Sequence, residues 1–416
     1  MKTFNIPAFY RSSVITPIKE FRRKNDKLKR DFTPTKLDFG PVQFFIARHF
    51  GFCYGVENAI DIAYSAIEQN PGKRIFLLSE MIHNPDVNRD LQERGVKFLM
   101  DTKGNKIVPW ETLTQEDIVI VPAFGTTVEI QQELSSLGID PYQYDTTCPF
   151  VEKVWNRASQ IGGKEYSIVV HGKPLHEETR ATFSHSKENA PTIVVKDLNQ
   201  AKRLASYITG ETPTEQFHEE FAGQFSEGFN PETDLQRIGV VNQTTMLASD
   251  TQGIADHLKN VMIRHYKLSP EDVENHFANT RDTLCYATND NQDATYALLT
   301  QEADFAIVAG GYNSSNTSHL VELCEKKLPT YFISTESKLL DKKLIKHYNI
   351  NTKQEEITED YISLSGKPLK ILLTCGASCP DAVVERILQR IVSFFPETKP
   401  VDEVLQTTFQ SVNSSK

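Results

Sequence analysis

The stretch FAIVAGGYNSSNTSHLVELCEKKLPTYFI, residues 305–333, contains one complete unit of the fold. It begins and ends with apolar runs of strand length, 305–309 and 330–333, which are rich in β-branched or aromatic residues. A helical stretch, 317–327, lies between them. A strand, a helix and a second strand in this order predict a parallel α/β unit with a right-handed crossover.

The same alternation continues along the chain from residue 42. The apolar runs that predict strands are 42–47, 74–78, 118–122, 166–170, 192–195, 238–241, 305–309, 330–333 and 369–373. The helical stretches between them are 56–69, 128–137, 198–208, 250–266, 293–302, 317–327 and 381–395. The pattern predicts an α/β protein of three small domains with mainly parallel sheets. We expect a basic extension at 1–42, domains at 43–147, 148–284 and 285–395, and a tail at 396–416.

Composition narrows the class of protein. The chain has 416 residues, 39% of them hydrophobic and 24% charged, as in ordinary globular enzymes. Six cysteines in this length do not form a disulfide scaffold, which favours a reducing compartment. No run approaches the roughly 18 apolar residues that span a bilayer. The net charge of −10 argues against nucleic acid as a partner.

The charge is unevenly distributed. Residues 1–42 hold ten Lys or Arg against four acids, whereas the stretch at about 209–234 is acidic. We expect the basic segment to pack on the body or to form a solvated arm, with an organelle transit segment as the alternative. Cytoplasm is therefore the simpler location, and a plastid or other organelle the alternative. We expect the acidic stretch to be a surface insertion away from the chemistry.

Three cysteines occur in similar local sequences. They are Cys53 in HFGFCYGVENAI (49–60), Cys148 in YDTTCPFVEKVW (144–155) and Cys285 in DTLCYATNDNQDA (282–294). Each follows a short apolar run or a tight turn and precedes a helix-like stretch. Three soft ligands from three separate segments would leave a metal centre one ligand short, and that position is open to a substrate.

The metal that such a triad would hold is open to more than one interpretation. Structural zinc normally takes four protein ligands at short pairwise spacing, and the chain has no CxxC. An iron–sulfur cluster tolerates distant ligands and so fits the spacing better. A single cysteine is more often structural than a ligand, and only the similarity of the three contexts favours a cluster. We interpret Cys324, Cys375 and Cys379 as bystanders.

Polar turns between strands and helices predict a phosphate site. Such turns present free N–H groups and the positive end of the helix dipole. One alone is weak evidence, because Ser and Asn are also favoured helix caps. The residues concerned are Ser314, Ser315, Asn316, Thr244, Thr245 and Ser378.

Histidines and one acid follow strand-like runs at helix starts. His83 and His176 could each donate to a phosphate oxygen or relay a proton. Glu178 lies two residues beyond His176 and offers a carboxyl group for proton delivery. His171 and His185 flank the same motif, and the sequence does not separate the four histidines by role.

Eight motifs in order resemble the LytB-type 4-hydroxy-3-methylbut-2-enyl diphosphate reductases, the family of the last enzyme of the non-mevalonate isoprenoid pathway. The resemblance covers roughly residues 43–395, and the basic and acidic segments are similar to those of its longer cyanobacterial and plant branch. The motifs are GFCYGV, IHNPDVNRDLQERGV, DTTCPFVEKVW, HEET, NQTT, CYAT with NQDA, NSSN, and GAS with PD.

The resemblance implies a set of site residues and partners. Cys53, Cys148 and Cys285 match the ligands of one [4Fe–4S] cluster, around which three domains are arranged with pseudo-three-fold symmetry. Glu178 matches the proton donor and Thr244 a threonine beside the substrate hydroxyl. A ferredoxin or flavodoxin type of electron donor is implied as well. The residues that match substrate contacts are His83, His176, Thr244, Ser314, Ser315, Asn316 and Ser378.

One position departs from the family pattern. Many shorter members have the motif AHG, whereas this chain has Ala123, Phe124 and Gly125. A phenyl ring cannot bind phosphate, so one diphosphate contact is absent or supplied elsewhere. The implied reaction is reductive dehydroxylation of an allylic diphosphate, giving isopentenyl and dimethylallyl diphosphates. The alternatives are a cluster-dependent hydratase or dehydratase, and a zinc-stabilised binding protein without enzymatic activity.

Overall fold

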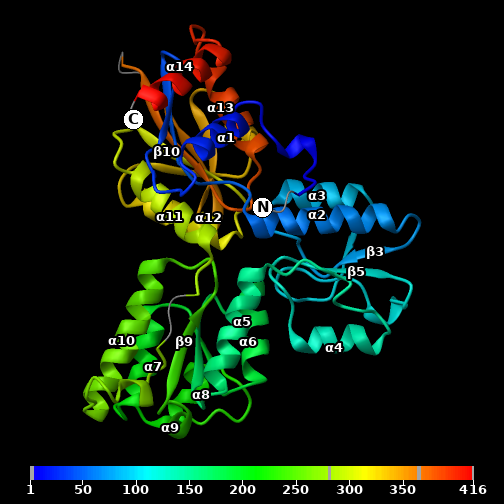
Figure 1. Cartoon of the computed structure of the whole chain (residues 1–416), viewed down its shortest axis with the longest axis vertical. Coiled ribbons are helices and arrows are strands. Elements are labelled where there is room, and N and C mark those ends of the chain that lie inside the picture. Colours follow the sequence, from blue (N-terminus) through cyan, green and yellow to red (C-terminus); the bar gives the residue numbers. More distant parts are fainter. Residues whose placement is uncertain (1–3, 280–282, 363–366, 415–416) are drawn as a thin grey trace. The chain divides into compact units, whose positions relative to one another are not determined.

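The chain folds into two compact units. The computed structural model describes residues 4–279, 283–362 and 367–414 (Figure 1). The first unit comprises Met1–Glu57, His83–Val87 and Tyr286–Lys416, and the second comprises Asn58–Ile82 and Asn88–Cys285.

The first unit is built on a five-stranded sheet. Four adjacent strands pair in parallel, and the edge strand β1 is antiparallel to β2. The strands in spatial order are β1 (Thr35–Asp38), β2 (Val42–Ile46), β14 (Leu369–Cys375), β10 (Phe305–Ala309) and β11 (Thr330–Ile333). A separate antiparallel hairpin is formed by β12 (Leu344–Asn349) and β13 (Gln354–Glu359).

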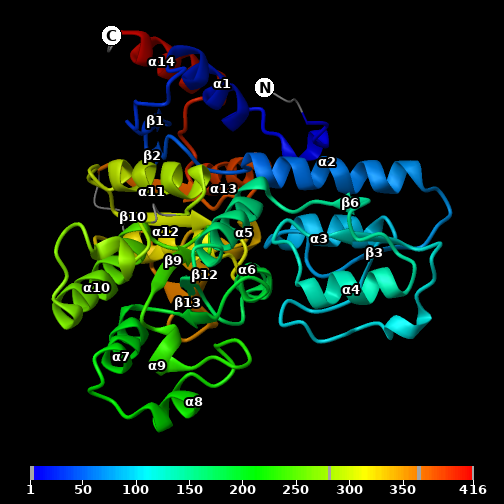
Figure 2. The ribbon, with the colours of Figure 1, turned by 60° about the horizontal axis from the view of Figure 1, so that its bottom comes forward.

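Helices from both ends of the chain pack on this unit. Helix α11 packs on α12, and α1 packs on α13. Helix α14 lies beside α1 and β1 (Figure 2). The bounds are α1 (Ile15–Asn25), α11 (Tyr286–Leu298), α12 (Ser315–Glu325), α13 (Asp381–Val392) and α14 (Val401–Ser414). The basic extension therefore packs on the body of its unit.

The second unit contains two parallel sheets. One has the order β4 (Lys97–Phe98), β3 (Ile75–Leu77), β5 (Ile118–Val121) and β6 (Tyr144–Asp145). The other has the order β8 (Thr192–Val195), β7 (Ser167–His171) and β9 (Ile238–Asn242). Helices α2 (Tyr54–Gln69) and α3 (Pro85–Glu93) begin in the first unit and continue into the second. The longer helices that lie wholly in the second unit are α4 (Val128–Ser136), α5 (Pro149–Gly162), α6 (Glu177–Lys187), α7 (Leu198–Ile208) and α10 (Ala248–Tyr266).

The three sheets confirm the predicted α/β class, but the chain is divided among them differently from our expectation. Strand β2 pairs with β14, so the segment that begins at residue 42 joins the C-terminal sheet instead of the sheet of β3 and β5. The reason is that parallel pairing needs no closeness in sequence, and composition does not reveal it. No described helix meets the length and hydropathy that crossing a membrane requires.

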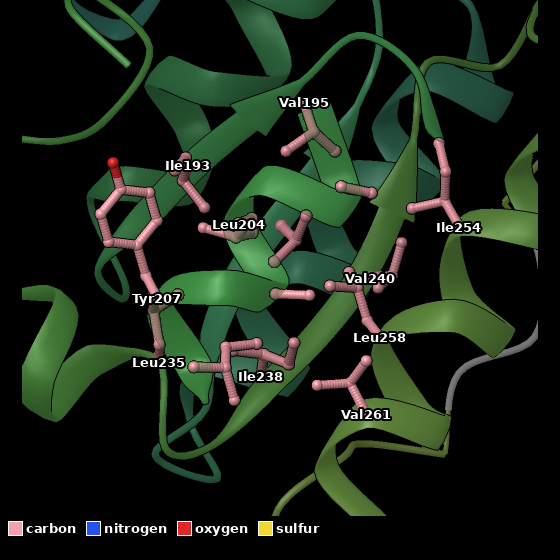
Figure 3. Packing of buried hydrophobic residues seen from close by; sticks show 14 of the residues in the cluster. Ile193, Val195, Leu204, Tyr207, Leu235, Ile238, Val240, Ile254, Leu258 and Val261 are labelled. Carbon is pink, nitrogen blue, oxygen red and sulfur yellow. The ribbon is translucent and has the colours of Figure 1, made fainter. Parts of the chain in front are cut away.

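The acidic insertion carries part of a core. Short helices α8 (Phe217–Glu220) and α9 (Pro231–Asp234) lie in it, and Phe217, Phe221 and Phe229 are buried in the cluster between the β8–β7–β9 sheet and helices α7 and α10. Figure 3 shows the sheet and helix side chains of this cluster. The insertion is thus acidic outside and aromatic inside, whereas its charge had predicted only a surface segment.

We expect Phe217→Ala to destabilise the protein by about 3–5 kcal/mol, because it leaves a cavity in a close-packed core. Phe217 is fully buried, and its ring stacks on Phe221 and Phe229 at centroid distances of 5.2 and 5.4 Å. Denaturant unfolding measures the loss. Glu215→Ala, at an exposed position of the same insertion, is the control and should change stability by no more than about 0.5 kcal/mol.

Candidate active site

The three cysteines singled out in the sequence all lie at helix starts. Cys53 and Cys285 directly precede α2 and α11, and Cys148 is the N-cap residue of α5. None of the three forms a disulfide, and all three are partly exposed. A thiolate is stabilised by the positive end of a helix dipole, so these thiols suit metal ligation. The remaining cysteines are buried: Cys324, Cys375 and Cys379.

Hydrogen bonds join each cysteine to a second segment. The N–H of Cys53 donates to the carbonyl of Ala377 at 3.3 Å. The N–H of Cys148 donates to Ala123 at 3.0 Å, and that of Cys285 to Thr244 at 3.2 Å. Burial raises the pKa of the Cys53 thiol, and hydrogen bonds from the N–H groups of the following turn offset only part of this rise. A metal that replaces the proton would therefore relieve the desolvation of this group.

Glu178 and Thr244 are brought together in the second unit. The backbone N–H of Thr244 donates to Oε1 of Glu178 at 2.6 Å, and both residues are buried. The carbonyl of Thr244 is the acceptor of the Cys285 N–H bond. One threonine therefore connects the predicted acid to a predicted cluster ligand.

His176 continues this run of contacts. It is the N-cap of α6, and its Nδ1 accepts a hydrogen bond from the backbone N–H of Glu178 at 3.2 Å. A neutral imidazole that accepts at Nδ1 carries its proton on Nε2, which is then the donor. Phe124 packs edge-on against the ring at a centroid distance of 5.7 Å. The residue that replaces the family histidine thus contacts His176, and Ala123 beside it bonds to Cys148.

The polar turns of the first unit also converge. Oδ1 of Asn316 accepts the N–H of Ala377 at 2.9 Å, and Ser378 Oγ donates to the carbonyl of His83 at 3.1 Å. Ser314 caps α12 by accepting the N–H of Thr317 at 3.2 Å. The turns after β10 and β14 and the start of α3 therefore meet at one edge of the five-stranded sheet.

Two donors at this edge are buried without a partner. Among the described residues, Ser315 Oγ and Asn316 Nδ2 have no hydrogen-bond partner. An orphaned buried donor costs free energy that a bound anion would recover. Both lie in the first turn of α12, where the helix dipole also favours an anion. This arrangement fits the predicted diphosphate site.

One positioning residue, Gln243, was not predicted from the sequence. Gln243 is fully buried, and its Oε1 accepts from the Lys173 N–H and the Thr179 hydroxyl at 3.2 and 3.0 Å. Its Nε2 donates to Thr245 at 2.8 Å, which fixes the turn of Thr244 against α6. A glutamine at a strand end, directly before two threonines, was the signal available in the sequence.

The other two histidines have partners of their own. Nδ1 of His171 lies 3.0 Å from the Thr251 hydroxyl, deep in the β8–β7–β9 layer. His185 stacks on Trp155 at 3.8 Å, and burial lowers its pKa. These contacts give both histidines a structural role, and neither needs a part in the reaction.

The three cysteines are divided between the units. Cys53 belongs to the first, and Cys148 and Cys285 belong to the second. Within the described part of the chain, no three Cys, His, Asp or Glu side chains form a metal-binding group. The three-cysteine cluster therefore stays a prediction.

Comparison with known proteins identifies one family. The model of the family described as LytB protein matches residues 44–392. A 4-hydroxy-3-methylbut-2-enyl diphosphate reductase of Picosynechococcus sp. is 38% identical over 383 residues, which are 92% of this chain and 89% of the relative. The same-named protein of Acaryochloris marina is 39% identical over 368 residues, 86% of each chain.

Solved structures share the fold. A structure of (E)-4-hydroxy-3-methyl-but-2-enyl diphosphate reductase, titled the terminal enzyme of the non-mevalonate pathway, has a TM-score of 0.50 at 23% identity. It covers 84% of this chain and 98% of its own. The E-1-hydroxy-2-methyl-but-2-enyl-4-diphosphate reductase of Plasmodium falciparum has a TM-score of 0.59 at 21% identity, covering 86% and 88%.

Proposed function

Since the chain belongs to the LytB protein family, we propose that it is a 4-hydroxy-3-methylbut-2-enyl diphosphate reductase. In this reaction the allylic C–O bond breaks and the oxygen leaves as water. Two electrons and two protons are consumed, and one proton ends on carbon. The products are isopentenyl and dimethylallyl diphosphates, depending on which end of the allyl group receives that proton.

The observation that carries the proposal is the connected run of Cys285, Thr244, Glu178 and His176. The backbone of Thr244 bonds to the Glu178 carboxyl group through its N–H and to the Cys285 N–H through its carbonyl. The carboxyl group is therefore one residue removed from a helix-start cysteine. Reductive removal of a hydroxyl group needs a proton donor beside the source of electrons. The described geometry supports this pairing of an acid with a ligand segment.

The donor set fits an iron–sulfur cluster. Cys53, Cys148 and Cys285 would hold it, since they are partly exposed residues at helix starts and form no disulfide. When bound, a [4Fe–4S] cluster with three cysteine ligands supplies electrons one at a time and one iron position free for substrate. The buried Cys324, with its pKa raised to about 12 by burial, is unsuited to ligation.

Side chains of the protein bind the substrate and donate the protons. The first turn of α12, with Ser315 and Asn316, binds the diphosphate and so orients the allylic end. Glu178 donates a proton to the departing hydroxyl oxygen. Thr244 holds that carboxyl group through its N–H, and its hydroxyl binds the substrate. His176 offers Nε2–H as a further donor, with Phe124 packed against its ring.

The electron donor we propose is a protein of the ferredoxin or flavodoxin type, because a cluster accepts single electrons from such carriers. For this chain itself we propose a cytoplasmic location. Support for this comes from the cyanobacterial relatives and from the packing of the basic extension on the body of the first unit.

Purification without oxygen tests the proposal. We expect a brown protein with about four iron and four sulfide per chain, and oxidation of a reduced electron donor only when substrate is present. A cluster-dependent hydratase would turn over without consuming reductant. A colourless zinc protein with no turnover would refute the proposal.

We expect Ser315→Ala to raise KM about tenfold with a smaller change in kcat, because a hydrogen bond to a charged group is lost. Steady-state kinetics and competition by inorganic diphosphate measure the effect. Ser318→Ala is the control: the Ser318 hydroxyl donates to the Ser314 carbonyl within α12. Equal KM values in the two variants would place the diphosphate elsewhere.

A further inference from the structure

The turn that carries Cys53 is held at its two ends by backbone bonds. The N–H of Ala47 donates to Leu373 at 3.1 Å, and that of Cys53 donates to Ala377 at 3.3 Å. Between them, residues 48–52 connect β2 to the start of α2. The basic extension supplies side chains that contact nearly every residue of this turn.

Lys19 of α1 closes over the middle of the turn. Its Nζ lies 4.2 Å from the centre of the Phe50 ring and pairs with Asp381, the first residue of α13. Gly51 adopts φ +76°, and a Cβ there would come within 2.7 Å of the Lys19 ammonium and 2.9 Å of Asp381. The lysine thus fits against bare backbone two residues before Cys53.

Aromatic rings of the extension flank Cys53 itself. Tyr10 packs edge-on against Phe52 at 5.6 Å, and Phe4 packs in the same way against Tyr54 at 5.0 Å. Edge-to-face pairs of this kind favour one orientation of the two rings. The residues before and after the cysteine are therefore both held by the extension.

The beginning of the turn has matching partners. The Phe32 ring lies edge-on to His49 at 5.4 Å, and Asp26 pairs with Arg48 at 3.8 Å. Burial lowers the pKa of His49 to about 4, so this ring is neutral and packs as an aromatic group at neutral pH. The contacts of the extension thus run from residue 48 to residue 54.

The extension also reaches the residue after a second cysteine. The backbone N–H of Tyr54 donates to the hydroxyl of Tyr286 at 3.0 Å. The ammonium of Lys29 lies 4.9 Å from the Tyr286 ring centre and pairs with Asp290 at 3.1 Å. Tyr286 follows Cys285 in the sequence, so one contact network joins the flanks of two predicted ligands.

From these contacts we infer that the basic extension is a clamp that holds the Cys53 turn in its ligating conformation and shields the Cys53 thiol. Its residues Lys19, Tyr10, Phe32 and Phe4 are positioning residues, since they touch the turn and no reacting atom. The inference rests on the proposed function, because it assigns Cys53 to a cluster. A structured cover of this kind would keep oxygen and chelators from one corner of the cluster.

The clamp is tested by the reactivity of Cys53 in the full-length, cluster-free, reduced protein. We compare Lys19→Met with Lys24→Met, which removes the same charge from an exposed position of the same helix. Limited alkylation with iodoacetamide, read by mass spectrometry, gives the rate at Cys53 with Cys148 as internal standard. We expect Lys19→Met to raise the Cys53 rate about threefold to tenfold, since local opening becomes easier.

Further variants sharpen the test. Lys19→Arg keeps a cation over the ring and should retain the slow rate, and adding Phe32→Ala to Lys19→Met should raise the rate further. In the holoprotein, the cluster absorption of Lys19→Met should decay faster in air than that of Lys24→Met.

Two outcomes overturn the clamp. One is an unchanged Cys53 rate in both Lys19→Met and the double variant. The other is an equal rise at Cys148, which would mean that the whole fold loosens. The alkylation needs no cluster, so a protein that never binds iron would refute the proposed function and leave this test valid.

Discussion

Replacing Glu178 with glutamine is expected to lower kcat by about 10² to 10⁴-fold, the range that a positioned general acid contributes. Glutamine keeps the size and the acceptor oxygen, so the bond from the Thr244 N–H at 2.6 Å can persist. What it loses is the proton that the hydroxyl group needs in order to leave as water. We therefore expect iron content and visible absorption to match the wild type, while single-turnover reduction slows.

The matched control for this variant is Glu188→Gln. Glu188 is the C-cap residue at the other end of α6 and is exposed, so the same substitution there should leave kcat within about twofold. Anaerobic stopped-flow with reduced enzyme measures the chemical step apart from cluster reduction. Unchanged single-turnover rates in Glu178→Gln would assign the proton to another residue.

The fully buried strands are the part of the fold that could be predicted well. The bounds expected for β8, β10 and β11 agree with the structure to the residue, because a strand buried on both faces reads as an uninterrupted apolar run. Strands β4 and β6 have two residues each and show no period. The hairpin of β12 and β13 is mostly polar and partly exposed, so its sequence resembles a loop.

Helix starts at the site were harder to predict. Helices α5 and α6 begin at Pro149 and Glu177, directly after the cysteine and histidine turns. The buried face of α5 is apolar, whereas that of α6 is mostly polar. The buried face of α6 includes threonines and serines, so the helix shows no periodic pattern of apolar residues. The buried polar groups of α6 include Glu178, so the weak signal of this helix and its proposed function have one cause.

The pairing of distant residues could not be predicted from the residues alone. Glu178 and Thr244 meet because β7 and β9 are parallel neighbours, with His171 in register with Asn242. That register brings the turns after both strands to one sheet edge. The sequence suggests each turn separately, but which strands are neighbours depends on the fold of the whole unit.

The second large effect is expected for the cysteines: Cys148→Ser should reduce bound iron to less than about a tenth of the wild-type content and abolish turnover. A serine oxygen is a harder and weaker ligand for an iron–sulfur cluster than a thiolate, and with only three protein ligands the loss of one leaves two. Cys53→Ser and Cys285→Ser should behave alike, since each is a partly exposed residue at a helix start.

Cys324→Ala is the matched control, because it also removes one thiol. Cys324 is fully buried on α12, so the change should cost some stability yet leave the iron and sulfide content and the visible absorption intact. The same reasoning applies to Cys375, which ends β14 in the core. Iron that survives in Cys148→Ser but is lost in Cys324→Ala would reverse the assignment. The three helix-start cysteines lie where the helix dipole stabilises a thiolate, whereas Cys324 and Cys375 are buried in the core. We therefore expect the loss of iron to follow that distinction and not the number of cysteines that remain.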